Sequence, residues 1–167
     1  MNPKSHSTPS PRKQGATVAV AVSTLTTIQI DWLIAQQEGV AVMFDGAYVR
    51  YALADENALG GVYSPSTDPA LGHPLLEREK IQLRHIDREG HSHHGLWLAQ
   101  DCLFWSTGSS VGWSEYGRSY ADLHFGYLSG PTMLIAGLRF IIAKTQVGKT
   151  KDPKVKVLRS LSKAQAA

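Results

Sequence analysis

The stretch from Thr132 to Thr145 constrains the fold most strongly, because its pattern is that of a helix that is apolar on nearly every side. Such a helix must be covered all round by other parts of the chain. Gly137 costs the helix about 1 kcal/mol relative to alanine, which indicates that another segment approaches the backbone closely there. Gly148 is expected to end the helix. The apolar residues that surround it are Met133, Leu134, Ile135, Leu138, Phe140, Ile141 and Ile142.

Two further helices are expected upstream. The first runs from about Thr24 to Gln37, with Ser23 or Thr24 as its N-cap and Gly39 after its end. The second is short and is expected to begin at Pro74, because proline is favoured at the first position of a helix.

Strand patterns fill most of the remaining chain. Asp45-Gly46 between two apolar runs predicts a hairpin, and the apolar run Val40–Phe44 predicts a central strand buried on both faces. Residues 55–61 are expected to form a loop. We predict one α+β domain over residues 16–158, a mixed or mainly antiparallel sheet packed against two main helices. The predicted strands are residues 16–22, 40–44, 47–53, 81–86, 95–100 and 155–158.

The net charge of +3 is distributed unevenly along the chain. Residues 1–23 contain three Lys/Arg and no acid, and residues 144–167 contain seven Lys/Arg and one Asp. Residues 24–143 contain seven Lys/Arg and thirteen Asp/Glu. We interpret residues 1–15 as a disordered basic tail and residues 159–167 as a frayed basic tail. These tails are expected to contact nucleic acid only weakly and without sequence preference, because the body itself is acidic.

Composition and motifs limit the function classes. Cys102 is the only cysteine, which is typical of a protein kept in a reducing cytoplasm. No apolar run reaches the length of a membrane span. The sequence contains no phosphate-loop or zinc-helix motif, and we expect a non-enzymatic protein without a cofactor. The partner is then expected to be another protein, and the oligomeric state stays open.

The candidate ligand-binding site is the polar stretch Tyr63–His73, which follows one apolar segment and precedes another. Long loops inside compact domains are often functional, and the hydroxyl and carboxylate groups here could receive a small polar or anionic group beside a helix N-terminus. The alternative, which we favour, is that these side chains cap their own backbone and that Arg139 pairs with a carboxylate. The candidate residues are Tyr63, Ser64, Ser66, Thr67, Asp68, His73 and Arg139.

Three histidines raise the question of a metal site. His91, His93 and His94 fall in a charged segment that reads as a hairpin tip. A zinc site needs three or four converging ligands with supporting hydrogen bonds. We predict no dedicated metal site and treat these residues as weak candidates only.

Several stretches resemble the NinX-like family, whose members are small proteins encoded by phages and prophages and have no established molecular function. The resemblance rests on YSPST at residues 63–67, on GHPLLERE at residues 72–79, and on residues 20–39 and 129–148. It spans roughly Val18 to Lys156, with gaps. Pro69, Leu71 and His73 stand where the family pattern has Trp, Gln and Gly.

The resemblance implies an accessory protein of phage or prophage origin that acts through protein–protein contact. The Gly-, Ser- and aromatic-rich residues 106–130 are one candidate surface for such a contact. The alternative is a small ligand-binding domain or hydrolase that uses the Tyr63–His73 loop.

Overall fold

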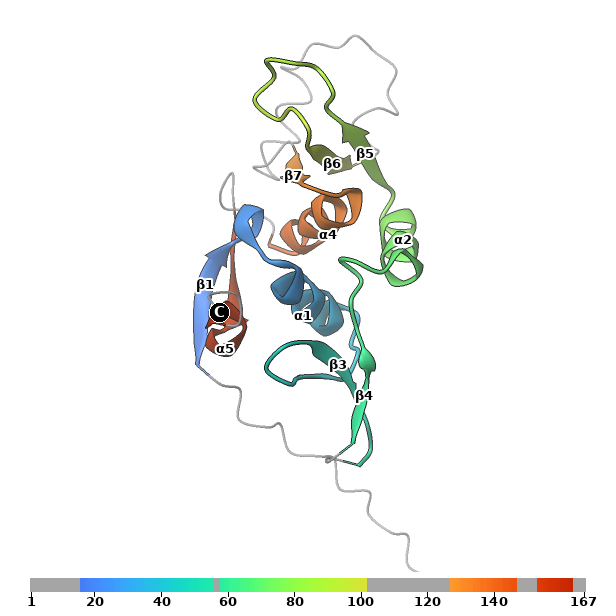
Figure 1. Ribbon diagram of the computed structural model, residues 1–167, viewed down its shortest axis with the longest axis vertical. Helices are drawn as coiled ribbons and strands as arrows, with labels where there is room; N and C mark the ends of the chain where they lie inside the picture. Colours follow the sequence, from blue (N-terminus) through green and yellow to red (C-terminus); the bar gives the residue numbers. More distant parts are fainter. Residues whose placement is uncertain (1–15, 56–57, 102–126, 147–152, 164–167) are drawn as a thin grey trace, which may run out of the picture.

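The fold is α+β, as predicted, but its strands form three small antiparallel sheets instead of one. The computed structural model describes residues 16–55, 58–101, 127–146 and 153–163. Helices occupy the middle of an elongated body, with one three-stranded sheet at each end and a strand pair along one side (Figure 1).

Helix α4, Met133–Lys144, is the centre of the core, as its sequence predicts. The Thr132 hydroxyl caps it by accepting a hydrogen bond from Ile135 N at 3.2 Å. Gly137 is buried, and a Cβ there would overlap Leu76 in helix α2, Pro69–Arg78. The close approach expected at this glycine is therefore confirmed.

Helix α1, Thr27–Gln37, packs against α4 but begins later than predicted. Residues 22–24 form a short 3-10 turn, η1, so neither Ser23 nor Thr24 is the cap. The cap is Thr26, whose hydroxyl accepts from Gln29 N at 3.3 Å while the Gln29 side chain accepts from Thr26 N at 3.1 Å. This reciprocal capping box satisfies two backbone N–H groups at once, which a single hydroxyl cap does not.

Strand β1, Thr17–Ala21, pairs antiparallel with β8, Lys154–Leu158, and both strands are predicted by the sequence. The chain then continues into helix α5, Arg159–Lys163, so the predicted frayed tail at 159–167 is wrong for its first five residues. The reason is Leu161, which is fully buried. The Ser162 hydroxyl also accepts a hydrogen bond from Gln29 at 3.2 Å, so part of the basic C-terminal segment belongs to the folded body.

The sheet at one end contains β2, Val42–Phe44, β3, Val49–Ala52, and β4, Leu59–Val62. The Asp45-Gly46 hairpin between β2 and β3 is confirmed. The prediction of Val40–Phe44 as a central buried strand is wrong, because β3 is the middle strand and β2 is a half-buried edge. The expected loop at 55–61 is partly strand: β4 includes Gly60, which lies so close to Tyr51 that only glycine fits there.

The sheet at the other end contains β5, Ile81–His85, β6, Trp97–Asp101, and β7, Leu128–Gly130. The β5–β6 hairpin is as predicted, and β7 pairs with β6 and contacts α4. Cys102 and most of the 106–130 segment lie outside the described residues.

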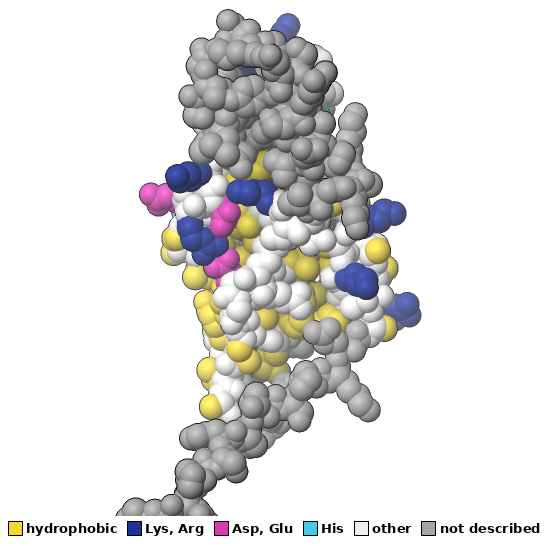
Figure 2. Space-filling view, turned by 180° about the vertical axis from the view of Figure 1, so that it is seen from behind, with side chains coloured by type: hydrophobic (Ala, Val, Ile, Leu, Met, Phe, Trp, Pro, Cys, Tyr) yellow, Lys and Arg dark blue, Asp and Glu magenta, His cyan; other side chains and the backbone are white. Residues whose placement is uncertain are grey.

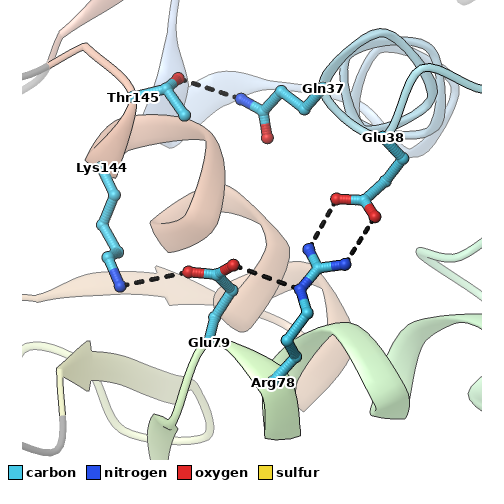
Figure 3. Close-up of polar contacts among 6 residues, drawn as sticks. All are labelled: Gln37, Glu38, Arg78, Glu79, Lys144 and Thr145. Atoms are coloured by element: carbon cyan, nitrogen blue, oxygen red, sulfur yellow. Dashed lines mark hydrogen bonds and ion pairs between the residues drawn. The ribbon is translucent and has the colours of Figure 1, made fainter.

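Ion pairs fasten the C-terminal ends of three helices to one another (Figure 3). Both terminal nitrogens of Arg78, in the last turn of α2, donate to the Glu38 carboxylate after α1, each at 2.7 Å. Glu79 accepts from Lys144 of α4 at 3.4 Å. The positive charges of Arg78 and Lys144 also interact favourably with the negative C-terminal ends of their own helix dipoles. These contacts join the C-terminal ends of α1, α2 and α4.

Among the described residues, no helix is long and apolar enough to span a bilayer.

Candidate functional site

The predicted long loop at residues 63–73 is a short turn at residues 64–68 followed directly by α2. Asp68 is the N-cap and accepts from Ala70 N at 2.9 Å, and Pro69 occupies the first helical position. The predicted start at Pro74 is therefore wrong, because the Asp-Pro pair upstream supplies both a cap and a fixed φ. His73 lies within α2 and is exposed.

The turn itself is closed by its own backbone. The Ser64 carbonyl accepts from Thr67 N at 3.0 Å and from Asp68 N at 2.8 Å. The Thr67 hydroxyl is exposed and makes only a long bond, 3.4 Å, to the same carbonyl. Tyr63 is buried, with its ring edge-on to Tyr51 at 5.3 Å between centroids. Burial raises the pKa of Tyr63 to about 12.

Ser66 holds the turn against α1 through a residue that the sequence did not single out as a site. It is 1% exposed, and its N–H donates to Asp31 Oδ1 at 2.8 Å. Asp31 is itself buried, and this burial raises the pKa of its carboxyl to about 6, although both the N–H and the hydroxyl of Ser66 act to lower it. In the sequence, the only indication that Asp31 is buried was its position on α1 beside the apolar stripe.

Arg139 is not brought to this turn. Its guanidinium donates to the Leu25 carbonyl at 2.7 Å and to the Ser129 carbonyl at 2.8 Å, which connects α4 to the residues after η1 and to β7. Both of these partners are backbone carbonyls, and the pairing of Arg139 with a carboxylate stays a prediction. The seven candidate residues therefore have different roles in the fold. Tyr63 and Ser66 are buried, His73 is exposed on α2, and Arg139 binds elsewhere. The other three, Ser64, Thr67 and Asp68, form the turn and the cap of α2.

The histidine segment lies between β5 and β6. The rings of His91 and His93 are 5.6 Å apart between centroids, and His91 Nδ1 accepts from His93 N at 3.1 Å. His93 also stacks edge-on against Tyr127 at 5.2 Å. Among the described residues, no three His, Cys, Asp or Glu side chains are placed to hold a metal ion.

The most exposed apolar side chains gather on the β2–β3–β4 sheet. Tyr48 is 54% exposed, Leu53 is 49% exposed and Val62 is 39% exposed, and these are three of the four large hydrophobic side chains exposed in the described residues. Figure 2 shows hydrophobic side chains along this end of the body. We call the surface around Arg50 the outer sheet face and define it by Met43, Tyr48, Arg50 and Val62.

The register explains why Arg50 lies at the centre of this face. Met43, Arg50 and Val62 are directly opposite one another on the three strands, so their side chains share one side of the sheet. Val49 and Tyr51 alternate to the other side and join the core.

Arg50 is fixed in place before any partner arrives. Its Nε donates to Asp45 Oδ2, its Nη1 donates to the Gly60 carbonyl at 3.4 Å, and its guanidinium carbon lies 5.6 Å from the centre of the Tyr48 ring. The hydrogen bond from Arg50, with two more from the backbone N–H groups of residues 47 and 48, lowers the pKa of Asp45 to about 2. Asp45 is thus ionised across the physiological pH range and holds the arginine in one orientation.

No family model and no curated protein matches this chain. The NinX-like resemblance stays a prediction.

Proposed function

We propose that this chain is an accessory protein of phage or prophage origin that acts in the cytoplasm by contacting another protein through the outer sheet face. The observation that carries the proposal is that Met43, Tyr48 and Val62 surround Arg50 on one small sheet, with Tyr48 and Val62 exposed. Scattered single apolar residues need no explanation, but a contiguous group on one face is typical of an interaction surface.

The chemistry of the face supports a protein partner. Tyrosine and arginine are the residues that most often contribute binding energy at the centre of interfaces. Arg50 is already oriented by Asp45 and stacked near Tyr48, so little side-chain entropy is lost when a partner covers it. We expect the partner to present an apolar patch with a hydrogen-bond acceptor for the arginine.

The placement of Ser66, Asp68 and Arg139 gives no support to the ligand-binding or hydrolase alternative. Ser66 N–H is bonded to Asp31, Asp68 caps α2, and Arg139 binds two backbone carbonyls.

The test is capture of a partner from host extract by the immobilised full chain, with matched variants. Tyr48→Ser combined with Val62→Ser removes two exposed apolar groups from the face. Tyr127→Ser is the control, because Tyr127 is 43% exposed but precedes β7 in the other sheet. We expect one specific protein to bind the wild type and the control and to be lost from the double variant. Equal recovery by all three chains would show that the outer sheet face is not the contact surface.

A further inference from the structure

An open groove of about 460 Å³ runs beside β8, where the ends of α1 and α4 meet it. Its floor is apolar, because Leu33, Ile142 and Val155 are buried. Its rim is polar, because Gln36 and Gln146 line it and are exposed. The groove lies away from the outer sheet face and shares no residue with it.

One wall of the groove is a strand with an unpaired edge. Among the described strands, only β1 pairs with β8. Val22 N donates to the Pro153 carbonyl and Arg159 N donates to the Ala16 carbonyl, at 2.9 and 2.8 Å.

These two bonds fix the direction of every backbone group in β8, because hydrogen-bonded and non-hydrogen-bonded pairs alternate along an antiparallel ladder. The N–H and C=O groups of Val155 and Val157 point toward β1, and those of Lys154 and Lys156 point away from it.

The charge on this side is of one sign. Lys154 and Lys156 are exposed and line the groove. Residues 153–163 contain four Lys/Arg and no Asp or Glu. In Figure 2 the Lys and Arg side chains on the right, over the β1–β8 side, have no acidic neighbour, and all the acidic side chains in view lie on the opposite side. A basic surface of this kind attracts an acidic partner and speeds its association.

We propose that the free edge of β8 binds an acidic peptide in extended conformation, which adds to the β1–β8 pair as a third strand. Backbone N–H and C=O groups of Lys154 and Lys156 would pair with the peptide backbone. Alternate peptide side chains face opposite sides, so carboxylates lie across from the two lysines while apolar side chains meet the floor at Leu33, Ile142 and Val155.

A peptide fits this edge better than a nucleic acid does. The edge offers donors and acceptors in alternation, which another strand matches along its whole length. A sugar–phosphate backbone presents mainly acceptors, so it could use the lysine charges but not the exposed carbonyls.

The test measures fluorescence anisotropy of a labelled peptide of alternating Glu and Val against the full chain. A Lys–Val peptide of the same length is the matched probe. We expect the Glu–Val peptide to bind at least about tenfold more tightly than the Lys–Val peptide, and added salt to weaken it. Undetectable binding of the Glu–Val peptide, or equal binding of the two peptides, would overturn the proposal.

Variants of β8 separate the backbone contribution from the charge contribution. Lys154→Gln with Lys156→Gln should weaken Glu–Val binding about tenfold, because two cross-strand ion pairs are lost. Lys156→Pro removes an N–H that points away from β1, so it leaves the β1 ladder intact, and it should abolish binding. Ala19→Pro is the matched control, since Ala19 is opposite Lys156 and its N–H points away from β8 on the far edge of the pair. It should bind like the wild type.

Two further measurements keep the result decisive even if the proline variant folds poorly. Methylating the peptide N–H groups that face β8 should abolish binding, whereas methylating those that face outward should not. Equal loss from both would overturn strand addition, as would equal binding by Lys156→Pro and Lys156→Gln. If single-stranded oligothymidylate binds as tightly as the Glu–Val peptide and is weakened by the same lysine variants, the site is a phosphate-binding face and the peptide proposal fails.

Discussion

The turn at residues 64–68 and the outer sheet face use polar and apolar side chains in opposite ways. The turn is polar in sequence, yet Ser66 is 1% exposed and its N–H is bonded to a buried carboxylate. The sheet is largely apolar in sequence, yet Tyr48 is 54% exposed. The turn is therefore part of the architecture, whereas the sheet leaves apolar surface for something outside the chain to cover.

The same contrast governs the aspartate in each region. Asp31, beside the turn, lies in the packed interior, and burial raises its pKa to about 6. Asp45, in the sheet hairpin, is held by Arg50 and two backbone N–H groups, which lower its pKa to about 2. Asp31 accepts hydrogen bonds in the interior at the cost of desolvating its carboxyl, whereas Asp45 acts through its negative charge, which pairs with Arg50.

The largest expected effect is on the turn. Asp31→Ala leaves the buried Ser66 N–H without its acceptor, which should lower the free energy of unfolding by about 2 kcal/mol. Urea unfolding near pH 5 is the measurement, because Asp31 is then mostly neutral in the folded state and the lost hydrogen bond dominates. Asp31→Asn is the control: it keeps an oxygen acceptor and should lose less than about 1 kcal/mol. Equal stability of Asp31→Ala and wild type would mean that the turn is not held by this bond.

The pH dependence of stability should separate the two aspartates. The folded pKa of Asp31, about 6, lies above the ordinary aspartate value of 3.8, so its contribution to stability is complete below about 3.8 and is lost as the pH rises through about 6. The folded pKa of Asp45, about 2, lies below 3.8, so its contribution is present above 3.8 and is lost as the pH falls through about 2.

Melting temperatures measured across this range check both signs. Asp31→Asn should abolish the decrease in melting temperature between about pH 4 and pH 7. Asp45→Asn should reduce only the decrease in melting temperature at strongly acidic pH. If Asp31→Asn showed the same decrease in melting temperature as the wild type, a group other than Asp31 would be responsible for it.

A smaller effect distinguishes neighbours within the turn. Ser66→Ala should lower the free energy of unfolding by about 1 kcal/mol, because the buried Ser66 hydroxyl hydrogen-bonds to the Asp31 carboxyl. Thr67→Ala should change it by less than about 0.5 kcal/mol, because that hydroxyl is exposed and its bond is long. Equal losses in calorimetric melting would show that both hydroxyls act alike and that the distinction by burial is wrong.

Local patterns predicted the parts of the fold that local physics determines. The all-round apolar pattern of α4 requires burial, and Asp45-Gly46 favours the turn that joins β2 to β3. The β5–β6 hairpin follows from two strand patterns around a polar tip. Each of these depends on residues close together in the chain.

The errors come from contacts between distant residues. Ser66 and Asp31 are 35 residues apart, so nothing near either one predicts their pairing. The run Val40–Phe44 reads as a central strand because its residues are apolar, but whether a strand is central depends on which strands lie on both sides. Leu161 is a single leucine in a basic segment, and only the contacts of α5 with α1, among them the hydrogen bond between Gln29 and Ser162, show that α5 packs back onto the body.

The smallest expected effect on stability belongs to the outer sheet face, and it is the sharpest test of the comparison. Tyr48→Ser and Val62→Ser remove side chains that already contact water, being 54% and 39% exposed, so each should change the free energy of unfolding by less than about 0.5 kcal/mol.

The informative comparison is between two measurements on the Tyr48→Ser/Val62→Ser double variant: the small change in its free energy of unfolding and the loss of partner recovery. A stable chain that no longer captures its partner shows that the apolar surface is kept for binding and not for folding. A loss of stability comparable to that of Asp31→Ala would instead mean that Tyr48 and Val62 support the sheet, because they pack against Arg50 and the neighbouring strands. In that case the turn and the sheet would both be architecture, and the contrast between them would fail.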